Sequence, residues 1–245
     1  MIGVILLRMR CREGVGVMRI STGKYSLLLL SLTFLVPVGL QGQQKDFQSW
    51  WEFSIDKGFD NGIDLSGEIE QRFKNNSLQY DRSLVTVAGE YDIKKYLEVA
   101  AGFRAFLDSD RELQLNAKYR VHMDVTGSHS LSRYDLSLRA RFQYGFEDIF
   151  DPAYSGGNNF VNRYRLKVAN HIFGTRFGWF ATVESWHLLS DQPNRLFYKM
   201  RYSAGVEYAL NFKSEFTVRY ILEDELNVAN PLQAHILVFG FSHSL

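Results

Sequence analysis

From residue 47 to the end of the chain, apolar and polar residues alternate with a period of two, and no helical period stands out. The clearest case is Arg133–Tyr144, in which one face carries Tyr134, Leu136, Leu138, Ala140, Phe142 and Tyr144 and the other is mostly charged. Successive side chains of a strand point to opposite sides, so the pattern predicts strands with one apolar and one polar face. It recurs in eleven segments, at 48–57, 62–74, 81–93, 96–107, 116–126, 131–145, 160–171, 177–188, 196–210, 214–226 and 233–244.

The connections between these segments alternate in length. We expect short turns at Phe59–Asn61, Lys94–Lys95, Ser128–Ser130 and Asn211–Lys213. We expect longer polar loops at Asn75–Tyr80, Asp108–Leu115, Gly145–Asn159, Ser190–Arg195 and Asn227–Gln233. Short periplasmic turns at one end and longer outer loops at the other are typical of outer-membrane barrels. Many of the segments also reach the roughly 9–11 residues that a tilted membrane-crossing strand needs.

The pattern therefore predicts an all-β fold, an antiparallel transmembrane β-barrel. Because single-chain bacterial barrels have an even number of strands, we expect ten or twelve, with twelve preferred. The segments at Gln48–Lys57 and 96–126 are the least regular. Alternation alone also fits a soluble barrel or sandwich, in which the apolar face points inward, and the sequence does not say which face is inside.

Two further features favour the membrane barrel. Aromatic residues gather near the predicted strand ends, including Trp50, Trp51, Tyr96 and Trp179, at the depth where Tyr and Trp prefer to lie in a membrane. The last predicted strand places Phe239, Phe241, His243 and Leu245 in one phase up to the final residue. Outer-membrane barrels typically end in this way, although an aromatic residue is more usual than Leu at the last position.

The first part of the chain resembles a secretory signal peptide. Arg19 and Lys24 precede an apolar stretch from Tyr25 to Val36, and a helix-breaking exit follows at Pro37–Gly42. The apolar stretch is shorter than the roughly 20 residues that a membrane-spanning helix needs. We therefore expect residues 1–42 to be a signal peptide, with Met18 as an alternative start, and residues 43–245 to form a single barrel domain.

Composition excludes several classes of protein. The 245 residues include 28 Lys and Arg against 27 Asp and Glu, and 46% are hydrophobic. This balance argues against a nucleic-acid-binding protein, and the hydrophobic share argues against a disordered chain. Removal of residues 1–42 leaves 23 basic and 26 acidic residues, a net charge of −3. It also removes Cys11, so the mature chain has neither a disulfide nor a thiolate site.

Four segments carry a resemblance to a known family. They are Q-S-W-W-E-F-S at Gln48–Ser54, S-G-E-I-E-Q-R at Ser66–Arg72, S-R-Y-D-L-S-L-R-A-R-F-Q-Y at Ser132–Tyr144, and H-I-L-V-F-G-F-S-H-S-L at His235–Leu245. In these segments the chain resembles domain-of-unknown-function family 2490, predicted outer-membrane proteins of Gram-negative bacteria. The resemblance implies a fold and a location, and it transfers no catalytic residue.

The polar face of the predicted strands collects charges of both signs. The candidate lumen cluster is Glu68, Glu70, Arg72, Arg139, Arg141, Arg165, Lys167, Glu184, Arg201 and Glu207. One interpretation is a pore in which Arg139, Arg141, Arg165 and Lys167 select anions. The other is a lumen filled by cross-strand ion pairs, which the even mixture of acids and bases favours.

Other candidate chemistry is weaker. His122 with Asp124, and Glu184 with His187, contain the ingredients of a His–carboxylate pair, but neither has a third ligand or nucleophile at a readable spacing. A lipid-acting barrel enzyme would need a Ser activated by His at the lipid-facing rim. Ser128–His129–Ser130, Ser185 with His187, and Ser242–His243–Ser244 place these residue types together, although no known lipase motif appears. We expect no catalytic, cofactor or metal site.

The sequence thus predicts a monomeric protein of the cell outer membrane, either a narrow pore or a structural envelope protein. Its expected partners are outer-membrane lipid and, during insertion, the barrel-assembly machinery. Two alternatives remain, a lipid-acting outer-membrane barrel enzyme and a soluble periplasmic β-barrel that binds a small ligand.

Overall fold

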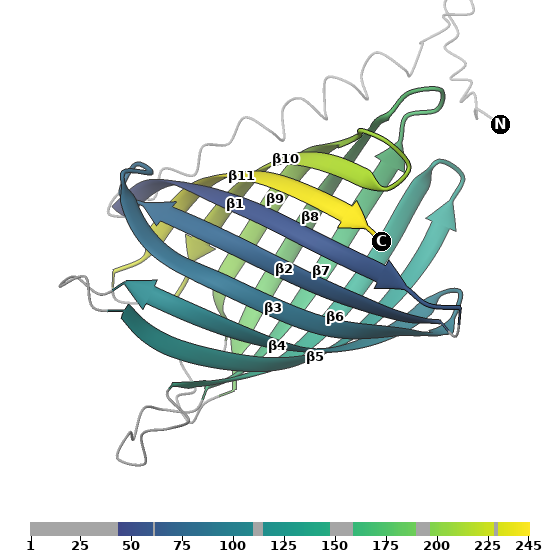
Figure 1. Cartoon of the computed structure of the whole chain (residues 1–245). Coiled ribbons are helices and arrows are strands. Elements are labelled where there is room, and N and C mark those ends of the chain that lie inside the picture. Colours follow the sequence, from purple (N-terminus) through teal and green to yellow (C-terminus); the bar gives the residue numbers. More distant parts are fainter. Residues whose placement is uncertain (1–43, 61, 110–114, 148–158, 190–196, 228–229) are drawn as a thin grey trace, which may run out of the picture. The chain divides into compact units, whose positions relative to one another are not determined.

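The computed structural model describes residues 44–60, 62–109, 115–147, 159–189, 197–227 and 230–245 (Figure 1). The predicted signal peptide and most of the predicted loop Gly145–Asn159 lie outside these residues. The described residues contain no helix that is long and apolar enough to cross a membrane. Their strands are β1 (Gln44–Gly58), β2 (Ile63–Lys74), β3 (Gln79–Lys94), β4 (Leu97–Ser109), β5 (Leu115–Leu131), β6 (Tyr134–Glu147), β7 (Asn159–His171), β8 (Phe177–Leu188), β9 (Phe197–Ala209), β10 (Ser214–Glu225) and β11 (Leu232–Ser244).

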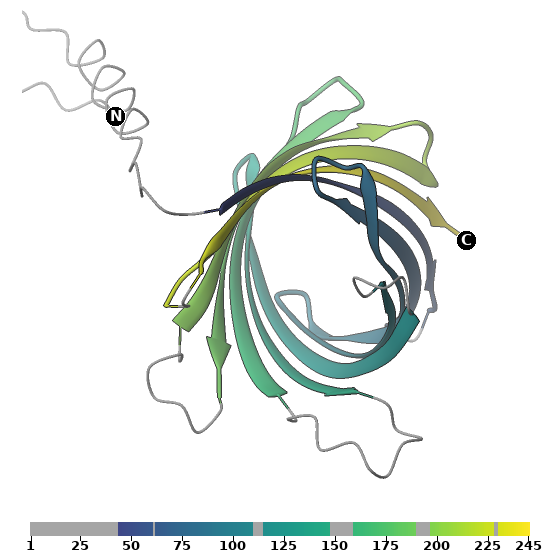
Figure 2. The same cartoon turned by 90° about the vertical axis from the view of Figure 1, so that its left-hand side faces the viewer.

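These strands close into a barrel in which every strand pairs with its neighbours in the chain, and β1 pairs with β11 (Figure 2). Consecutive strands are antiparallel, whereas β1 and β11 are parallel, with a one-to-one register from Gln44 opposite Leu232 to Asp56 opposite Ser244. The prediction of ten or twelve strands is wrong, because the barrel of the described residues has eleven. An odd number of up-and-down strands leaves the first and the last running in the same direction, and a parallel ladder can join them.

The two faces of the strands separate as the alternation predicts. In β1, Trp50 points inward and is 3% exposed, whereas its neighbour Trp51 points outward and is 53% exposed. In β2, Leu65 and Ile69 are exposed and Glu70 is buried. The wall is therefore apolar outside and polar inside, the reverse of a water-soluble barrel.

Aromatic side chains on the outer face connect the first and last strands. Trp51 stacks on Phe239 with ring centroids 4.8 Å apart, and Phe53 stacks on Phe241 at 5.7 Å. Such pairs stabilise a structure by about 0.5–1.5 kcal/mol beyond the area they bury. They fall at the parallel β1–β11 pair, where no hairpin turn helps to set the register.

The predicted turn at Ser128–Ser130 is also wrong. These residues belong to β5 and pair with β6, with Ser128 opposite Ser137 and Leu131 opposite Tyr134. The turn is Ser132–Arg133, where Ser132 has a φ of 60°. A polar His–Ser segment looks like a turn in sequence, but its residues can equally form the end of a long hairpin.

The two ends of the barrel differ in their connections. One end, called the short-turn end, carries the connections 59–62, 95–96, 132–133, 172–176 and 210–213. The other, called the long-loop end, carries 75–78, 110–114, 148–158, 189–196 and 226–231. At 75–78, Asn75, Asn76 and Ser77 all have a positive φ, a conformation that Asn adopts more readily than most residues.

Gly102 gives a test of the packing inside the wall. A Cβ at this position would overlap the imidazole ring of His122 and lie 3.0 Å from Cβ of Ala88. We expect Gly102→Ala to lower the free energy of unfolding by about 1–3 kcal/mol, because the buried His122 ring must move. Denaturant unfolding of the refolded barrel, followed by tryptophan fluorescence, measures this change.

The matched control is Gly67→Ala, because a Cβ at Gly67 meets no atom within 4 Å. It should alter the free energy of unfolding by no more than about 0.5 kcal/mol, as for an ordinary surface substitution. An equal loss in both variants would contradict the steric explanation.

Candidate functional site

The inward side chains line several cavities, and two of them carry most of the basic residues. The central cavity has a volume of about 320 Å³. The second, at the long-loop end, has a volume of about 700 Å³. Both are lined by Trp50, Arg72, Arg104, Arg163 and Arg201. All ten residues of the predicted lumen cluster line the central cavity.

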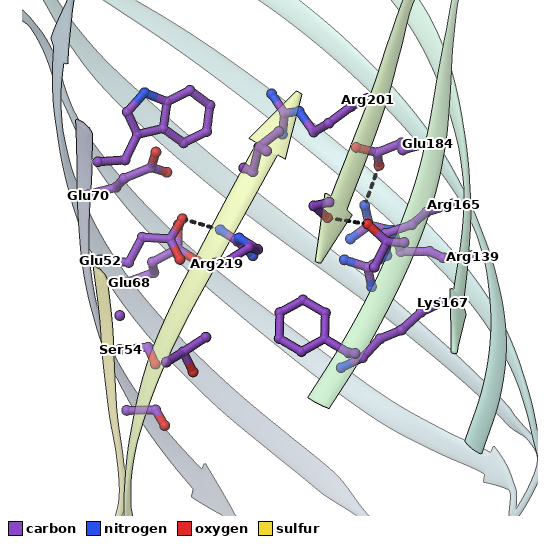
Figure 3. Close-up of a pocket in the computed structure, with 18 of the residues that line it drawn as sticks. Glu52, Ser54, Glu68, Glu70, Arg139, Arg165, Lys167, Glu184, Arg201 and Arg219 are labelled. Atoms are coloured by element: carbon purple, nitrogen blue, oxygen red, sulfur yellow. Dashed lines mark hydrogen bonds and ion pairs between the residues drawn. The ribbon is translucent and has the colours of Figure 1, made fainter. Parts of the chain in front are cut away.

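Glu184 lies at the centre of the basic side of this cavity (Figure 3). Its side chain is 4% exposed, and its two carboxylate oxygens accept hydrogen bonds from Nη2 of Arg139 and Nη2 of Arg163, each at 2.8 Å. The three residues come from the neighbouring strands β8, β6 and β7. Arg165 is the direct register partner of Glu184, but among the described residues it forms no ion pair within 4.0 Å.

Asp124 extends this network to β5. It accepts two hydrogen bonds from Arg141, at 2.7 Å from Nε and 2.6 Å from Nη2, and lies 3.6 Å from Nη1 of Arg139. Asp124 and Glu184 thus each form ion pairs with two arginines, and Arg139 pairs with both carboxylates. Bidentate guanidinium–carboxylate pairs are strong and fix the relative orientation of their partners. The predicted basic cluster is therefore partly neutralised, because Arg139 and Arg141 are both paired.

The opposite side of the cavity is acidic. Glu52 of β1 and Glu68 and Glu70 of β2 lie there, across the cavity from Arg139, Arg165 and Lys167 (Figure 3). Each carboxylate has a basic partner: Arg219 lies 2.6 Å from Glu52, Arg104 lies 3.1 Å from Glu68, and Arg72 lies beside Glu70.

At the long-loop end, basic side chains stack on two tryptophans. The guanidinium of Arg72 lies 3.7 Å from the ring centroid of Trp50, and that of Arg201 lies between Trp50 and Trp186, at 5.3 and 4.7 Å. Arg201 and Lys199 also pair with Glu223. The prediction placed Trp50 among the interfacial aromatics, whereas the structure places it in the lumen.

Arg163 and Glu52 belong to this site but were missed by sequence reasoning. Arg163 precedes Arg165 and Lys167 at a period of two, and Glu52 lies between Trp50 and Ser54 in the same phase. The alternation could therefore have identified both. It could not identify the pairing partners, because these depend on the relative shift of neighbouring strands.

The other candidate groups are dispersed. His122 and Asp124 are both buried on the inner face, and Asp124 is held by Arg141. The described residues contain no group of three or more His, Cys, Asp or Glu that could hold a metal ion. His243 pairs with Ser214 rather than with its neighbouring serines, through Nδ1 and Oγ at 2.9 Å.

Ser185 and His187 do come together. Their Oγ and Nε2 atoms are 3.1 Å apart on β8, in the phase opposite to the inward-facing Glu184. The His187 ring packs against Tyr164, which is exposed on the outer face. Asn162 of β7 is the register partner of His187.

Comparison with known proteins gives a family and a similar structure. Residues 47–230 match the family described as "Protein of unknown function (DUF2490)". No curated protein matches this chain. A solved structure described as "NanC porin structure in rhombohedral crystal form" is 14% identical, with a TM-score of 0.48. The alignment covers 72% of this chain and 86% of the other.

The Glu184 network leads to a stability prediction. We expect Glu184→Gln to lower the free energy of unfolding by about 3–5 kcal/mol, because it leaves the charges of Arg139 and Arg163 without their shared carboxylate. Denaturant unfolding of the refolded barrel measures the loss. Glu207→Gln is the control, because Glu207 lies 3.9 Å from Lys167 at the limit of an ion pair and should contribute less than about 1 kcal/mol. Equal losses would mean that the shared carboxylate has no special role.

Proposed function

This chain belongs to DUF2490, a family of proteins of unknown function, and from the polarity of its wall we propose that it is an outer-membrane β-barrel with a narrow pore. The observation that carries the proposal is the apolar outer face. Large apolar side chains are exposed around the wall, among them Ile69, Val87, Met123, Leu138 and Leu166. Water-soluble monomers rarely expose contiguous apolar patches of more than a few hundred Å². In a bilayer these side chains contact lipid hydrocarbon, so their exposure carries no hydration cost.

The backbone supports the same proposal. Closure through β1 and β11 leaves no open sheet edge, which is a requirement for any sheet that crosses hydrocarbon. The strands contain 12 to 17 residues, more than the roughly 9–11 that a crossing needs. In outer-membrane barrels the short turns lie in the periplasm and the longer loops face outward. We therefore place the short-turn end in the periplasm and the long-loop end at the cell surface. Export through the predicted signal peptide and insertion by the barrel-assembly machinery, as a monomer, belong to the same proposal.

The lumen combines ion pairs with open space. A lumen filled by ion pairs alone would act as a plug, and the network around Glu184 and Asp124 does fill part of the cross-section. However, the central cavity and the long-loop cavity share five lining residues, so the space between the charges extends along the barrel. This favours a narrow pore for small solutes over a purely structural barrel. Conductance steps in a planar bilayer containing the purified chain test it, and a barrel that inserts but never conducts would be structural.

Depth-dependent substitution tests the membrane location. Met123 lies in the middle of β5 and is 65% exposed, whereas Leu131 lies at the short-turn end of the same strand and is also exposed. We expect Met123→Arg to cost about 2–4 kcal/mol in lipid vesicles and Leu131→Arg about 0–1 kcal/mol, because the cost of a charge falls towards the interface. Denaturant unfolding from vesicles measures both values.

A soluble barrel would show no such difference between the two variants. Cell fractionation gives an independent test of location. Recovery of the chain from the periplasm without detergent would overturn the proposal.

A second candidate function rests on the hydrogen bond between Ser185 and His187. Both residues lie on the outer face of β8, close to the long-loop end, where a lipid ester could reach them. In such a site His187 would take the proton from Ser185 Oγ as this oxygen attacks the ester carbonyl. The alcohol would leave with that proton, and water would then release the acid. Asn162, opposite His187, is in a position to orient the ring.

We expect Ser185→Ala to lower the rate of ester hydrolysis by at least about 100-fold, since the nucleophile is removed. Release of fatty acid from phospholipid vesicles measures the rate. Ser137→Ala, on β6, is the control, because Ser137 lies away from the Ser185–His187 pair. No release by the wild-type chain, or equal release by wild type and Ser185→Ala, would exclude the assignment.

A further inference from the structure

The charge of the lumen changes from one end of the barrel to the other. The cavity at the long-loop end, which we call the arginine vestibule, is lined by nine Lys and Arg and only four Asp and Glu. At the short-turn end, a cavity of about 230 Å³ is lined by four Asp and Glu and two Arg. The central cavity between them still has nine basic and five acidic residues. An anion that enters from the long-loop end therefore meets an excess of positive charge first.

Part of this positive charge has no carboxylate partner within the described residues. Arg120 lines the vestibule, and its guanidinium lies 4.7 Å from the ring centroid of Phe106 rather than beside an acid. Further along the lumen, Arg165 is also without an ion pair in the described part of the chain. A guanidinium that is not occupied by a protein carboxylate can donate to an oxyanion from solution.

Two tryptophans hold several other basic side chains of the vestibule in place. Trp186 is covered by Arg163 at 4.5 Å and by Arg201 and Lys199 at 4.7 Å, while Trp50 is covered by Arg72. Stacking uses the flat face of a guanidinium and leaves the N–H groups at its edge. Because the stacked groups are already ordered, an oxyanion that binds their edges causes little further loss of conformational entropy.

Basic side chains continue from the vestibule along β7. Arg163, Arg165 and Lys167 are spaced two residues apart and all line the central cavity, in order from the long-loop end towards the short-turn end. Arg139 and Arg141 of β6 lie beside them, with Arg139 opposite Arg165 and Arg141 opposite Arg163 in the register. Across the cavity Glu52, Glu68 and Glu70 are each paired with an arginine. The surplus positive charge therefore lies on the β6–β7 side, which offers an anion the more favourable path.

From these observations we propose that the arginine vestibule binds small solutes that carry a carboxylate or phosphate group, and that the lumen prefers anions to cations. This inference rests on the proposed pore. Its ligand is a free solute rather than a lipid headgroup, because the vestibule residues line the lumen and not the outer face. Arg120 is the specificity-determining residue that can be changed without breaking an ion pair of the described residues.

The test is the reversal potential of the purified chain in a planar bilayer with a gradient of KCl. The wild type should pass chloride in preference to potassium. Arg120→Gln should lower the permeability ratio of chloride to potassium by about two- to threefold, the effect of one unit charge several ångströms from an ion in water. Arg133→Gln removes the same charge from the exposed Ser132–Arg133 turn and should leave the ratio unchanged.

Added inorganic phosphate provides a second readout that does not depend on selectivity between small ions. Millimolar phosphate on the long-loop side should reduce the chloride current of the wild type, and it should do so less in Arg120→Gln. A comparable melting temperature for both variants shows that folding is intact.

The outcomes separate the two proposals. A chain that inserts but does not conduct overturns both the pore and the anion preference. A chain that conducts, but with a permeability ratio of chloride to potassium of one or below, supports the pore and overturns the proposed anion preference. A chloride current that phosphate does not reduce overturns the proposed binding site in the vestibule. An equal loss in Arg120→Gln and Arg133→Gln would assign the preference to total charge rather than to the vestibule.

Discussion

The register between the first and last strands is the constraint on which the rest of the barrel depends. Gln44–Asp56 pairs residue by residue with Leu232–Ser244, and no turn connects the two strands. Side chains alternate along a strand, so a slip of one residue would move Glu52 to the outer face and Phe53 into the lumen. The stacked pairs of Trp51 with Phe239 and Phe53 with Phe241 would separate in the same slip. The register of this pair therefore keeps the polar face of β1 towards the lumen at the point where the barrel closes.

Ion pairs take the place that an apolar core has in a soluble barrel, but they have a different effect. A buried pair gains little net free energy, because desolvation offsets much of the attraction, whereas an unpaired buried charge is costly. The pairs at Asp124 and Glu184 thus contribute less to stability than to the choice of one arrangement. They connect the consecutive strands β5, β6, β7 and β8 on the inner side of the wall. A shift of two residues would keep the apolar face outside but would break these pairs.

The alternation in the sequence predicted where the strands lie and which face of each strand is polar. It could not predict how the strands close into a barrel. Each of the eleven predicted segments falls mainly within one strand, and residues such as Glu70 and Arg139 are on the inner face. Both follow from the period of two, which is visible in any single strand. Other features depend on how whole strands are arranged relative to one another. These are the number of strands, the parallel pairing of β1 with β11, and the ion pair of Arg139 with Glu184 two strands away. Trp50 and Trp51 are adjacent residues of the same type, and only the alternation of the strand determines that Trp50 faces the lumen and Trp51 faces outward.

The sharing of carboxylates connects the architecture of the lumen to its proposed selectivity. Glu184, Asp124 and Glu223 each serve two basic side chains, which holds several strands together with few acids. Sharing leaves more positive than negative charge along the β6–β7 side and in the vestibule. A fully neutral lumen would need no ions from solution and could remain closed. In the proposed pore, surplus positive charge would be balanced by anions from the solvent, so the arrangement that orders the arginines would also draw anions into the barrel.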